Sequence, residues 1–430
     1  MEQIFEKKFF KALQRFGEKM AGSKVFSAIA GGLQSTMGFI LAGAIFQIIV
    51  IMLDLFKAAE EGGALHNFLM MPVNMTIGVI SVIVAYGIAY MYARVQKMKS
   101  PMSCGIVSLI LFMMVAAPVQ TVILENGETM TVMDMTGLGS IGLFTAFLIA
   151  LISVKITKLC TDKKIAIRLP DAVPSIMADA FTSIIPLTIN ILLFHGLNSL
   201  VMAATGVTLP LIITGIFTMI FGAVSSLGGV IFITVAAMIL WLLGIHGTSV
   251  VFVVCMPLYM QVILENGALV AAGQDPVFHP ILLVLLHTAI GGAGGTLGLV
   301  ILGMRSKSAQ IKAVSKAGIV PSLFSINEPV TFGMPIVYNP ILAIPYILTP
   351  VVVIILYWIG YSTGFLVPPY VLILTFMPIG MVDFFGSLSW TNAIFPFLLI
   401  PVSLLMYYPF FKIYEKQLLK KEAAVNETVK

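Results

Sequence analysis

Ser325-Ile326-Asn327-Glu328-Pro329 places an acidic side chain inside the stretch from Ile319 to Phe411, which contains neither lysine nor arginine. A charged side chain at the middle of a membrane costs roughly 2.5–3.5 kcal/mol or more. A carboxylate in apolar sequence, with no basic residue nearby in the chain, therefore needs a compensating interaction. Function is the default explanation in a membrane protein, and the alternative is a carboxylate that caps a helix or binds backbone amides. We interpret Glu328 as the leading site residue.

The chain around this segment has the composition of a polytopic membrane protein. Of its 430 residues, 59% are hydrophobic and 10% are charged, whereas soluble domains carry roughly 25% charged residues. A bilayer needs ~20 apolar residues per crossing helix. Long apolar runs recur at Val25–Leu53, Val73–Ala93, Met102–Pro118, Ile141–Ile156, Val230–Leu243, Ile281–Gly303, Ile341–Ile359 and Ala393–Phe411. They predict an all-α membrane fold without a soluble domain of ordinary size.

The basic residues predict the topology. Twenty-three of the 24 lysines and arginines fall in five clusters, at residues 1–24, 94–99, 155–168, 305–316 and 412–430. The positive-inside rule makes each cluster a cytoplasmic candidate, so both termini are expected in the cytoplasm. Acidic residues mark the two loops expected outside, namely Asp54, Glu60, Glu61, Glu125, Glu128 and Asp134. The net charge of +5 thus reflects topology and does not indicate a nucleic-acid partner.

The spacing of prolines divides the chain. Residues 1–24 form an amphipathic cytoplasmic segment, 25–180 a scaffold of regular spans, 181–411 a substrate-binding membrane domain, and 412–430 a cytoplasmic tail. The third part contains Pro321, Pro329, Pro335, Pro340, Pro345 and Pro350. Such spacing cannot support a straight helix, so we expect broken helices or re-entrant hairpins there. Non-helical backbone at membrane depth is tolerated where it is buried in protein or lines a wet cavity, as in a transporter site.

His246 is the second candidate. Glycine stands on both sides of it in Gly244-Ile245-His246-Gly247, which predicts a tight turn or a close backbone approach. The alternative is a core histidine bonded to a carbonyl.

Other candidates are less distinctive. His195 could line the cavity or pack near a helix end. Trp241 and Trp390 could stack on a sugar face, although tryptophan is more often found in the interfacial belt. We interpret His279 as interfacial and His287 as structural.

Two further patterns have no catalytic interpretation. The run Gly291-Gly292-Ala293-Gly294-Gly295-Thr296 lacks the ending of a nucleotide-binding loop. Its GxxxG spacings predict close helix packing within a span. The hexapeptide Val-Ile-Leu-Glu-Asn-Gly occurs at 122–127 and again at 262–267, which suggests a duplication or a repeated turn. The three cysteines have neither disulfide nor metal-ligand spacing, and no metal or cofactor is expected.

The segment Ser-Ile-Asn-Glu-Pro-Val-Thr-Phe-Gly-Met-Pro at 325–335 closely resembles the signature of the membrane-embedded IIC component of bacterial sugar phosphotransferase systems. Gly-Ile-His-Gly at 244–247 resembles that family's other marker. Both occur in the same order as in the family, and the lactose, cellobiose and diacetylchitobiose branch is the most similar.

The resemblance implies about ten transmembrane helices, two re-entrant hairpins and interfacial amphipathic helices. It also implies a homodimer in the bacterial cytoplasmic membrane, built mainly through the N-terminal half, so that residues 25–180 would be the scaffold and dimerisation domain. It implies a β-linked disaccharide bound between the segments that bear His246 and Glu328, with Asn327, His195, Trp241 and Trp390 as further substrate-binding candidates. Phosphorylated IIB would reach the cytoplasmic face. Because no IIB-type soluble domain is recognisable in the chain, IIB and IIA are expected to be separate polypeptides.

These residues suit phosphoryl transfer to a sugar hydroxyl, which needs positioning and a carboxylate to take the hydroxyl proton. We assign Glu328 to orient and deprotonate the 6-hydroxyl, and His246 to orient the same region or stabilise developing charge. The cluster Arg305, Lys307, Lys312 and Lys316 could receive IIB or could serve only as a topology signal. A proton-coupled secondary sugar transporter, with Glu328 and His246 as a relay, is the rival hypothesis.

Overall fold

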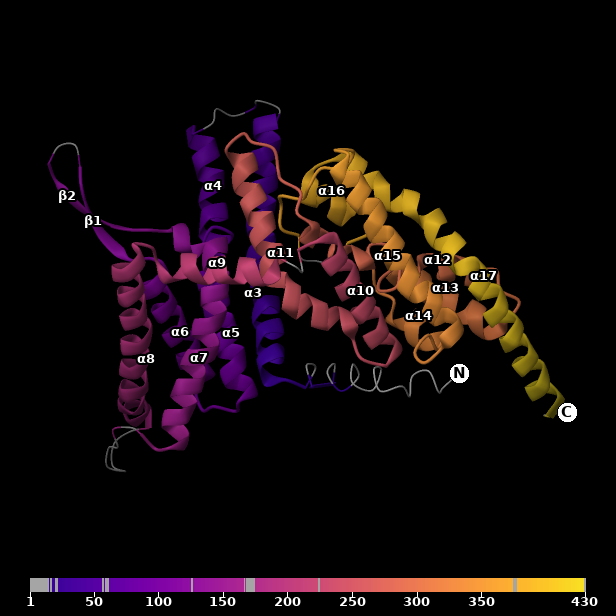
Figure 1. Ribbon diagram of the computed structural model, residues 1–430, viewed down its shortest axis with the longest axis horizontal. Coiled ribbons are helices and arrows are strands. Elements are labelled where there is room, and N and C mark those ends of the chain that lie inside the picture. Colours follow the sequence, from indigo (N-terminus) through magenta and orange to yellow (C-terminus); the bar gives the residue numbers. More distant parts are fainter. Residues whose placement is uncertain are drawn as a thin grey trace. The chain divides into compact units, whose positions relative to one another are not determined.

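The computed structural model is built almost entirely from helices (Figure 1). It describes residues 15, 18–19, 22–55, 58, 62–124, 127–165, 167, 175–222, 225–373 and 377–428. Within these residues, seven helices are long and apolar enough to cross a membrane, and three shorter apolar helices lie at Pro101–Ala116, Leu209–Met219 and Leu227–Leu242. The predicted helical, polytopic membrane fold is confirmed. Most of the N-terminal segment 1–24, and the acidic residues Glu60, Glu61 and Glu125, lie outside the described residues.

The chain forms two compact units, one made of Gly22–Phe221 and one that contains Gly222–Lys430. This division falls later in the chain than the predicted boundary at residues 180/181. Two helices, α8 (Ser175–Thr205) and α9 (Leu209–Phe221), therefore belong to the N-terminal unit. They pack on α7 (Leu143–Asp162), and the Thr214 hydroxyl of α9 donates a 2.6 Å hydrogen bond to the Ile141 carbonyl.

The N-terminal unit is organised around α5 (Ile80–Val95), which packs against three other helices. These are α3 (Lys24–Leu55), α6 (Pro101–Ala116) and α7, and α4 (Ala64–Thr76) packs on α3. Glycine permits the closest approach, because a Cβ on Gly32 would lie 2.7 Å from the backbone of Ile88. Small residues at helix contacts are the usual means of packing in membranes, where apolar lipid competes equally for apolar side chains.

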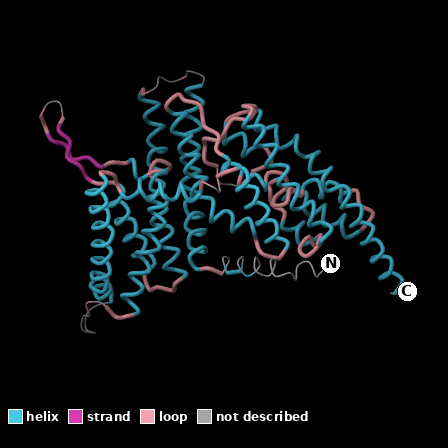
Figure 2. The backbone as a smooth tube through the Cα atoms, in the orientation of Figure 1, coloured by secondary structure: helices cyan, strands magenta, loops and turns pink. Residues whose placement is uncertain are grey.

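A β-hairpin interrupts this helical unit. Strands β1 (Val119–Ile123) and β2 (Thr129–Met133) pair antiparallel, with Val119 opposite Met133 and Ile123 opposite Thr129. Figure 2 shows the pair extending from the helices of its unit. This hairpin is an addition to the predicted all-α fold. The available signal was an Asn-Gly dipeptide between two short runs rich in threonine and β-branched residues, and most apolar side chains of the two strands are exposed.

The C-terminal unit contains long helices and short broken elements. Its helices are α10 (Leu227–Leu242), α11 (Gly247–Ala271), α12 (Leu297–Met304), α13 (Ala309–Leu323), α14 (Glu328–Gly333), α15 (Pro340–Ser362), α16 (Met381–Ser387) and α17 (Trp390–Thr428). The 3₁₀ turns η3 (Pro280–Leu283) and η4 (Leu286–Thr288) precede α12; in the N-terminal unit, η1 (Thr136–Leu138) and η2 (Ser140–Gly142) precede α7. Figure 1 shows α17 running alongside α12 and α15.

Two segments of this unit turn back on themselves, as expected for two re-entrant hairpins. In the glycine hairpin, residues 280–304, the chain runs through η3 and η4, turns at Gly291–Thr296 and returns as α12. In the glutamate hairpin, residues 309–333, α13 is followed by a turn at Phe324–Asn327 and by α14. Val330 of α14 packs against Gly318 of α13, where a Cβ would lie 2.6 Å from it.

The glycine run forms a turn that also packs closely on helices. Four of its residues have positive φ: Gly291 (75°), Gly292 (84°), Gly294 (82°) and Gly295 (62°). Glycine adopts this region without the steric penalty that other residues incur, so the run is a turn and not part of a continuous span. The predicted close packing is present, because a Cβ on Gly294 would lie 2.3 Å from Tyr346 of α15 and one on Gly298 2.5 Å from the backbone nitrogen of Leu404 in α17.

The prolines break the chain only in part. Pro321 lies near the end of α13, Pro329 at the start of α14, and Pro335 in a loop. In contrast, α15 runs for 23 residues with Pro345 and Pro350 inside it. The expectation of breaks throughout the segment is therefore wrong for α15. Membrane helices tolerate proline because neighbouring groups satisfy the backbone positions that it frees.

We expect Gly294→Ala to destabilise the protein more than Gly364→Ala. Both residues have positive φ, 82° and 74°, and the left-handed conformation costs a non-glycine residue roughly 1–2 kcal/mol. Only the Cβ at Gly294 meets an obstacle, the buried Tyr346 ring at 2.3 Å, whereas nothing lies within 4 Å of one at Gly364. Overpacking adds a further ~1–3 kcal/mol. Thermal unfolding in detergent measures the difference, and equal midpoints for the two variants would contradict this account of the turn.

Candidate functional site

Glu328 is held at the tip of the glutamate hairpin. The amide of Ile326 donates to the Pro321 carbonyl and closes the turn, in which Ser325 has a φ of 61°. Asn327 is the N-cap of α14, Glu328 its first residue and Pro329 its second. Proline suits this position because the first amides of a helix have no partner within the helix. The local sequence therefore begins a new helix at the carboxylate.

Asn327 joins this tip to the tip of the glycine hairpin. Its buried Nδ2 donates to the carbonyl oxygen of Ala293 and, over 3.3 Å, to Oγ1 of Thr296. Thr296 in turn donates to the Gly291 carbonyl over 2.7 Å. A Cβ on Gly292 would lie 2.7 Å from Oδ1 of Asn327, so glycine is required for the contact. Asn327, predicted as a substrate ligand, has both amide hydrogens engaged within the protein and only Oδ1 available for another partner.

His246 lies in the turn between α10 and α11. Gly244 has a φ of 81°, and a Cβ on Gly247 would lie 2.0 Å from the carbonyl oxygen of Ala237. The predicted tight turn and close backbone approach are both confirmed. His246 is the N-cap of α11, where its Nδ1 accepts the Ser249 amide over 3.1 Å and lies 2.8 Å from the Ser249 hydroxyl.

The structure brings His246 and Glu328 together. Nε2 of His246 lies 3.6 Å from Oε1 of Glu328, and their side chains are 48% and 45% exposed. Because Nδ1 accepts a backbone N–H, the proton of the neutral imidazole is on Nε2 and faces the carboxylate. Oε2 of Glu328 is shielded from solvent and has no hydrogen-bond partner among the described residues. The half-exposed pair thus presents the Nε2–H donor of His246 beside the carboxylate of Glu328.

Trp241 packs against the imidazole of His246. Its indole is 3% exposed, and its ring centroid lies 4.3 Å from that of His246 and 6.3 Å from that of Phe332. The predicted neighbourhood of Trp241 and His246 is therefore present. Because the indole is buried against these two rings, the structure gives it a role in holding His246, without an exposed face for a sugar.

Trp390 begins a helix of the same unit. It is the first residue of α17, is 72% exposed, and packs on Phe384 with centroids 4.6 Å apart. Its exposed ring therefore keeps an apolar face that could receive a sugar.

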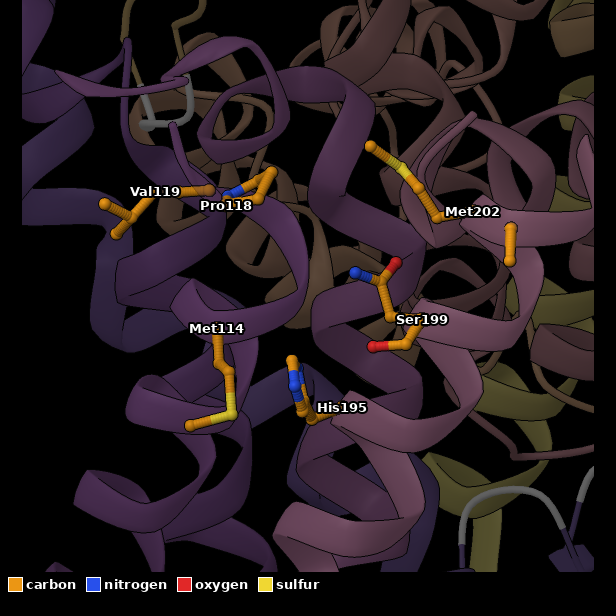
Figure 3. Close-up of a pocket in the computed structure, with 9 residues that line it drawn as sticks. Met114, Pro118, Val119, His195, Ser199 and Met202 are labelled. Carbon is orange, nitrogen blue, oxygen red and sulfur yellow. The ribbon is translucent and has the colours of Figure 1, made fainter. Parts of the chain in front are cut away.

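His195 belongs to the N-terminal unit. It lines a cavity of about 670 Å³ with neighbours from α6, α8 and the start of β1 (Figure 3). These are Met114, Ala117, Pro118, Val119, Asn198, Ser199, Met202 and Ala203. His195 does line a cavity, and that cavity is formed by the unit that does not contain Glu328.

Tyr338 is a site residue that sequence reasoning missed. Its amide donates to the Leu242 carbonyl over 2.9 Å, and its hydroxyl donates to the Leu243 carbonyl over 3.0 Å. It therefore fastens the chain after α14 to the turn that bears His246. The available signal was a tyrosine beside asparagine and proline, a typical turn composition, and its φ is 57°.

The described residues hold no group of three or more His, Cys, Asp or Glu side chains that could bind a metal ion. Cys104, Cys160 and Cys255 are free and buried, as predicted for packing residues.

Comparison with known proteins identifies the family. The family model described as Phosphotransferase system, EIIC matches residues 30–350. The chain belongs to the EIIC family of the phosphotransferase system. It is therefore an integral membrane component of a sugar phosphotransferase system, and the resemblance seen in the Asn-Glu-Pro and Gly-Ile-His-Gly segments is confirmed.

Similar EIIC proteins match almost end to end. The lichenan permease IIC component of Bacillus subtilis (strain 168) is 33% identical over 98% of this chain and 95% of its own length. The cellobiose-specific EIIC component of Geobacillus stearothermophilus is 31% identical over 94% and 93%. The crystal structure of the transporter ChbC, the IIC component from the N,N'-diacetylchitobiose-specific phosphotransferase system, has a TM-score of 0.87 and 29% identity over 97% of this chain and 99% of that one.

We expect Asn327→Asp to destabilise this EIIC protein by ~1–3 kcal/mol, the cost of leaving a buried hydrogen-bonding group unpaired. Aspartate replaces the donor that faces Ala293 and Thr296 with an oxygen. Asn339→Asp is the matched control, because Asn339 uses its Oδ1 to accept the amides of Ile341 and Leu342, and aspartate caps helices equally well. Thermal unfolding measures both variants. A stable Asn327→Asp protein would show that the two tips do not depend on this amide.

Proposed function

We propose that this EIIC protein takes up a β-linked disaccharide of the diacetylchitobiose or cellobiose type and presents its 6-hydroxyl to phosphorylated IIB. The names of the similar proteins, which refer to lichenan, cellobiose and N,N'-diacetylchitobiose, support this substrate class. The observation that carries the proposal is the half-exposed pair with Nε2 of His246 3.6 Å from Oε1 of Glu328.

The chemistry of the pair fits phosphoryl transfer to a hydroxyl. Oxygen O6 of the sugar attacks the phosphorus atom of phosphocysteine on IIB, so that the O–P bond forms and the S–P bond breaks. The hydroxyl proton passes to the Glu328 carboxylate, and the cysteine thiolate leaves. The Nε2–H of His246 donates to the same oxygen or to the phosphoryl group, which positions the reactants and stabilises developing charge.

Recognition of the hydroxyl also follows from the pair. The half-exposed carboxylate of Glu328 accepts from a sugar hydroxyl, and the Nε2–H of His246 donates to a sugar oxygen. Asn327 and Trp241 would then act by holding Glu328 and His246 in place. Trp390, which is exposed, would offer a stacking face for the sugar, and His195 lines the cavity of the N-terminal unit.

IIB would dock on the face marked by the basic clusters, with both chain termini in the cytoplasm. Lys312 and Lys316 are exposed one turn apart on α13, the helix that packs on α14. They therefore lie on the helix that packs against the start of α14, where Glu328 stands. Arg305 and Lys307 are exposed in the segment just before α13. We propose that IIB and IIA are separate polypeptides; the names of the lichenan and cellobiose relatives, which refer to IIC or EIIC alone, support this arrangement, whereas the lactose-specific relatives are named EIICB. A homodimer in the bacterial cytoplasmic membrane completes the proposal.

A proton-coupled sugar transporter is the rival function that Glu328 and His246 would also suit. It would deliver unmodified sugar and stop when the proton gradient collapses. The proposed function delivers sugar phosphate and depends on the phosphoryl donor. Membership of the EIIC family favours the second.

We expect Glu328→Gln to lower the rate of sugar phosphorylation by ~10²-fold or more, the usual effect of losing a positioned base. Sugar affinity should fall by ~10-fold, because a hydrogen bond to a charged acceptor is lost. The assay uses vesicles with purified IIB, IIA and the upstream phosphoryl donors, and measures sugar phosphate and free sugar inside. Glu265→Gln is the control, since Glu265 is an exposed glutamate of α11. Unchanged phosphorylation in Glu328→Gln removes this residue from the mechanism, and free sugar as the product supports the rival function.

We expect the double substitution Lys312→Gln and Lys316→Gln to raise the KM for phosphorylated IIB about 5- to 10-fold while leaving sugar affinity unchanged. Charges at the rim of an interface mainly change the association rate and its dependence on salt. The pair Lys97→Gln and Lys99→Gln removes the same charge from two exposed lysines of the N-terminal unit and serves as control. If both pairs change the KM for IIB equally, the effect is one of net charge and the docking surface lies elsewhere.

A further inference from the structure

A chain of hydrogen bonds lies behind the turn that bears His246. Nε1 of Trp241 donates to Oγ1 of Thr248 over 3.0 Å. Oγ1 of Thr248 lies 3.4 Å from Nε2 of His287, and Nδ1 of that histidine lies 2.6 Å from the Val284 carbonyl oxygen. His287 is buried. Three side chains from α10, α11 and the glycine hairpin are thus joined in one line.

The chemistry of the groups sets a single direction for this chain. A carbonyl oxygen can only accept, so Nδ1 of His287 carries a proton and donates it. In the neutral imidazole, Nε2 is then bare and accepts from the Thr248 hydroxyl. The indole N–H of Trp241 can only donate, so Thr248 accepts from it. Every group is used, and no alternative tautomer of His287 satisfies the chain.

This chain reaches His246 by two routes. Trp241 provides the ring on which the imidazole of His246 rests, with centroids 4.3 Å apart. Thr248 lies in the first turn of α11, next to Ser249, whose amide binds Nδ1 of His246. Loss of the Thr248 hydroxyl would therefore release both the supporting ring and the turn that orients Nε2.

The far end of the chain connects His246 to the glycine hairpin. His287 lies in η4 of that hairpin, and the hairpin tip holds Asn327, the residue before Glu328. His246 is thus linked to the glycine hairpin through Thr248 and His287, and Glu328 is linked to the same hairpin through Asn327. The distance between Nε2 of His246 and Oε1 of Glu328 therefore depends on the glycine hairpin.

We propose that Trp241, Thr248 and His287 form a positioning chain that sets the orientation of His246 toward Glu328 and the reacting hydroxyl; this rests on the proposed function of the pair. None of the three need touch the substrate. His287, which its sequence suggested to be merely structural, has its effect on turnover through His246.

The test substitutes Thr248 in two ways. Thr248→Val keeps the shape and removes the hydroxyl, whereas Thr248→Ser keeps the hydroxyl. We expect Thr248→Val to lower kcat for sugar phosphorylation about 10-fold or more, as misplacement of a catalytic group does, while the sugar KM changes less than about 3-fold. Thr248→Ser should stay within about 2-fold of the unsubstituted protein. Thr234→Val is the control, because Thr234 is a buried threonine of α10 whose hydroxyl bonds to nothing.

A double-mutant cycle separates positioning from general stability. If the chain acts through His246, adding Thr248→Val to His246→Gln causes no further loss of kcat. Thr248→Val with an unchanged kcat, or with the same loss in both backgrounds, overturns the proposal. The thermal midpoints of all variants show whether a loss of kcat is due to misfolding. If Thr248→Val proves to be misfolded, kcat of Thr248→Ser is compared with that of the unsubstituted protein. If Glu328→Gln is inactive while Thr248→Val is normal, only the positioning chain fails; if Glu328→Gln is active, the proposed function itself fails.

Discussion

The amide of Asn327, buried between two chain turns, is the contact on which the C-terminal unit depends. It donates to the carbonyl of Ala293 and to the hydroxyl of Thr296, so it joins the tip of the glutamate hairpin to the tip of the glycine hairpin. In a protein surrounded by lipid, backbone groups outside helices must find partners within the protein. Two interrupted segments are therefore stable only if side chains from elsewhere complete their hydrogen bonds.

Helix α17 completes the remaining bonds of the glycine tip. The Tyr407 hydroxyl donates to the Gly294 carbonyl over 2.7 Å, and the Ser403 hydroxyl to the Gly295 carbonyl over 2.6 Å. The amide of Gly298 donates to Ser403 over 3.0 Å. Polar residues buried in α17 thus satisfy the turn, and the glycines leave room for them. The result is a rigid base for a site that contains little regular structure.

Glu328 and His246 come together above this turn from two different helix starts. Glu328 begins a short helix after a break, and His246 caps a long helix after a glycine turn. The neighbouring proline and glycine residues place each of them at the start of a helix, where a polar side chain can bind backbone amides and contact solvent. Tyr338, Trp241 and the chain through Thr248 and His287 then limit how far the two can separate. Precise placement by surrounding residues, more than any single strong contact, is what phosphoryl transfer demands.

The sequence by itself determined the membrane class and the breaks in the chain around Glu328 and His246. These conclusions depend on local physics: the cost of a charge in apolar sequence, the freedom of glycine and the limits of proline. Local sequence patterns were misleading where contacts with residues distant in the chain decide the backbone conformation. Gly291–Gly295 forms a turn because Asn327, Ser403 and Tyr407 satisfy it, and α15 continues through two prolines because it is packed within its unit.

The repeated hexapeptide shows the same limit most directly. At Val122–Ile123 its first residues are strand, whereas at 262–267 the identical letters lie within α11. Identical local preferences cannot select between these outcomes, so the surroundings must. Only the tertiary structure decided that His246 and Glu328 meet and that Asn327 and Trp241 are buried next to them. The reason is that pairing and burial depend on residues distant in the chain, whose positions no local pattern records.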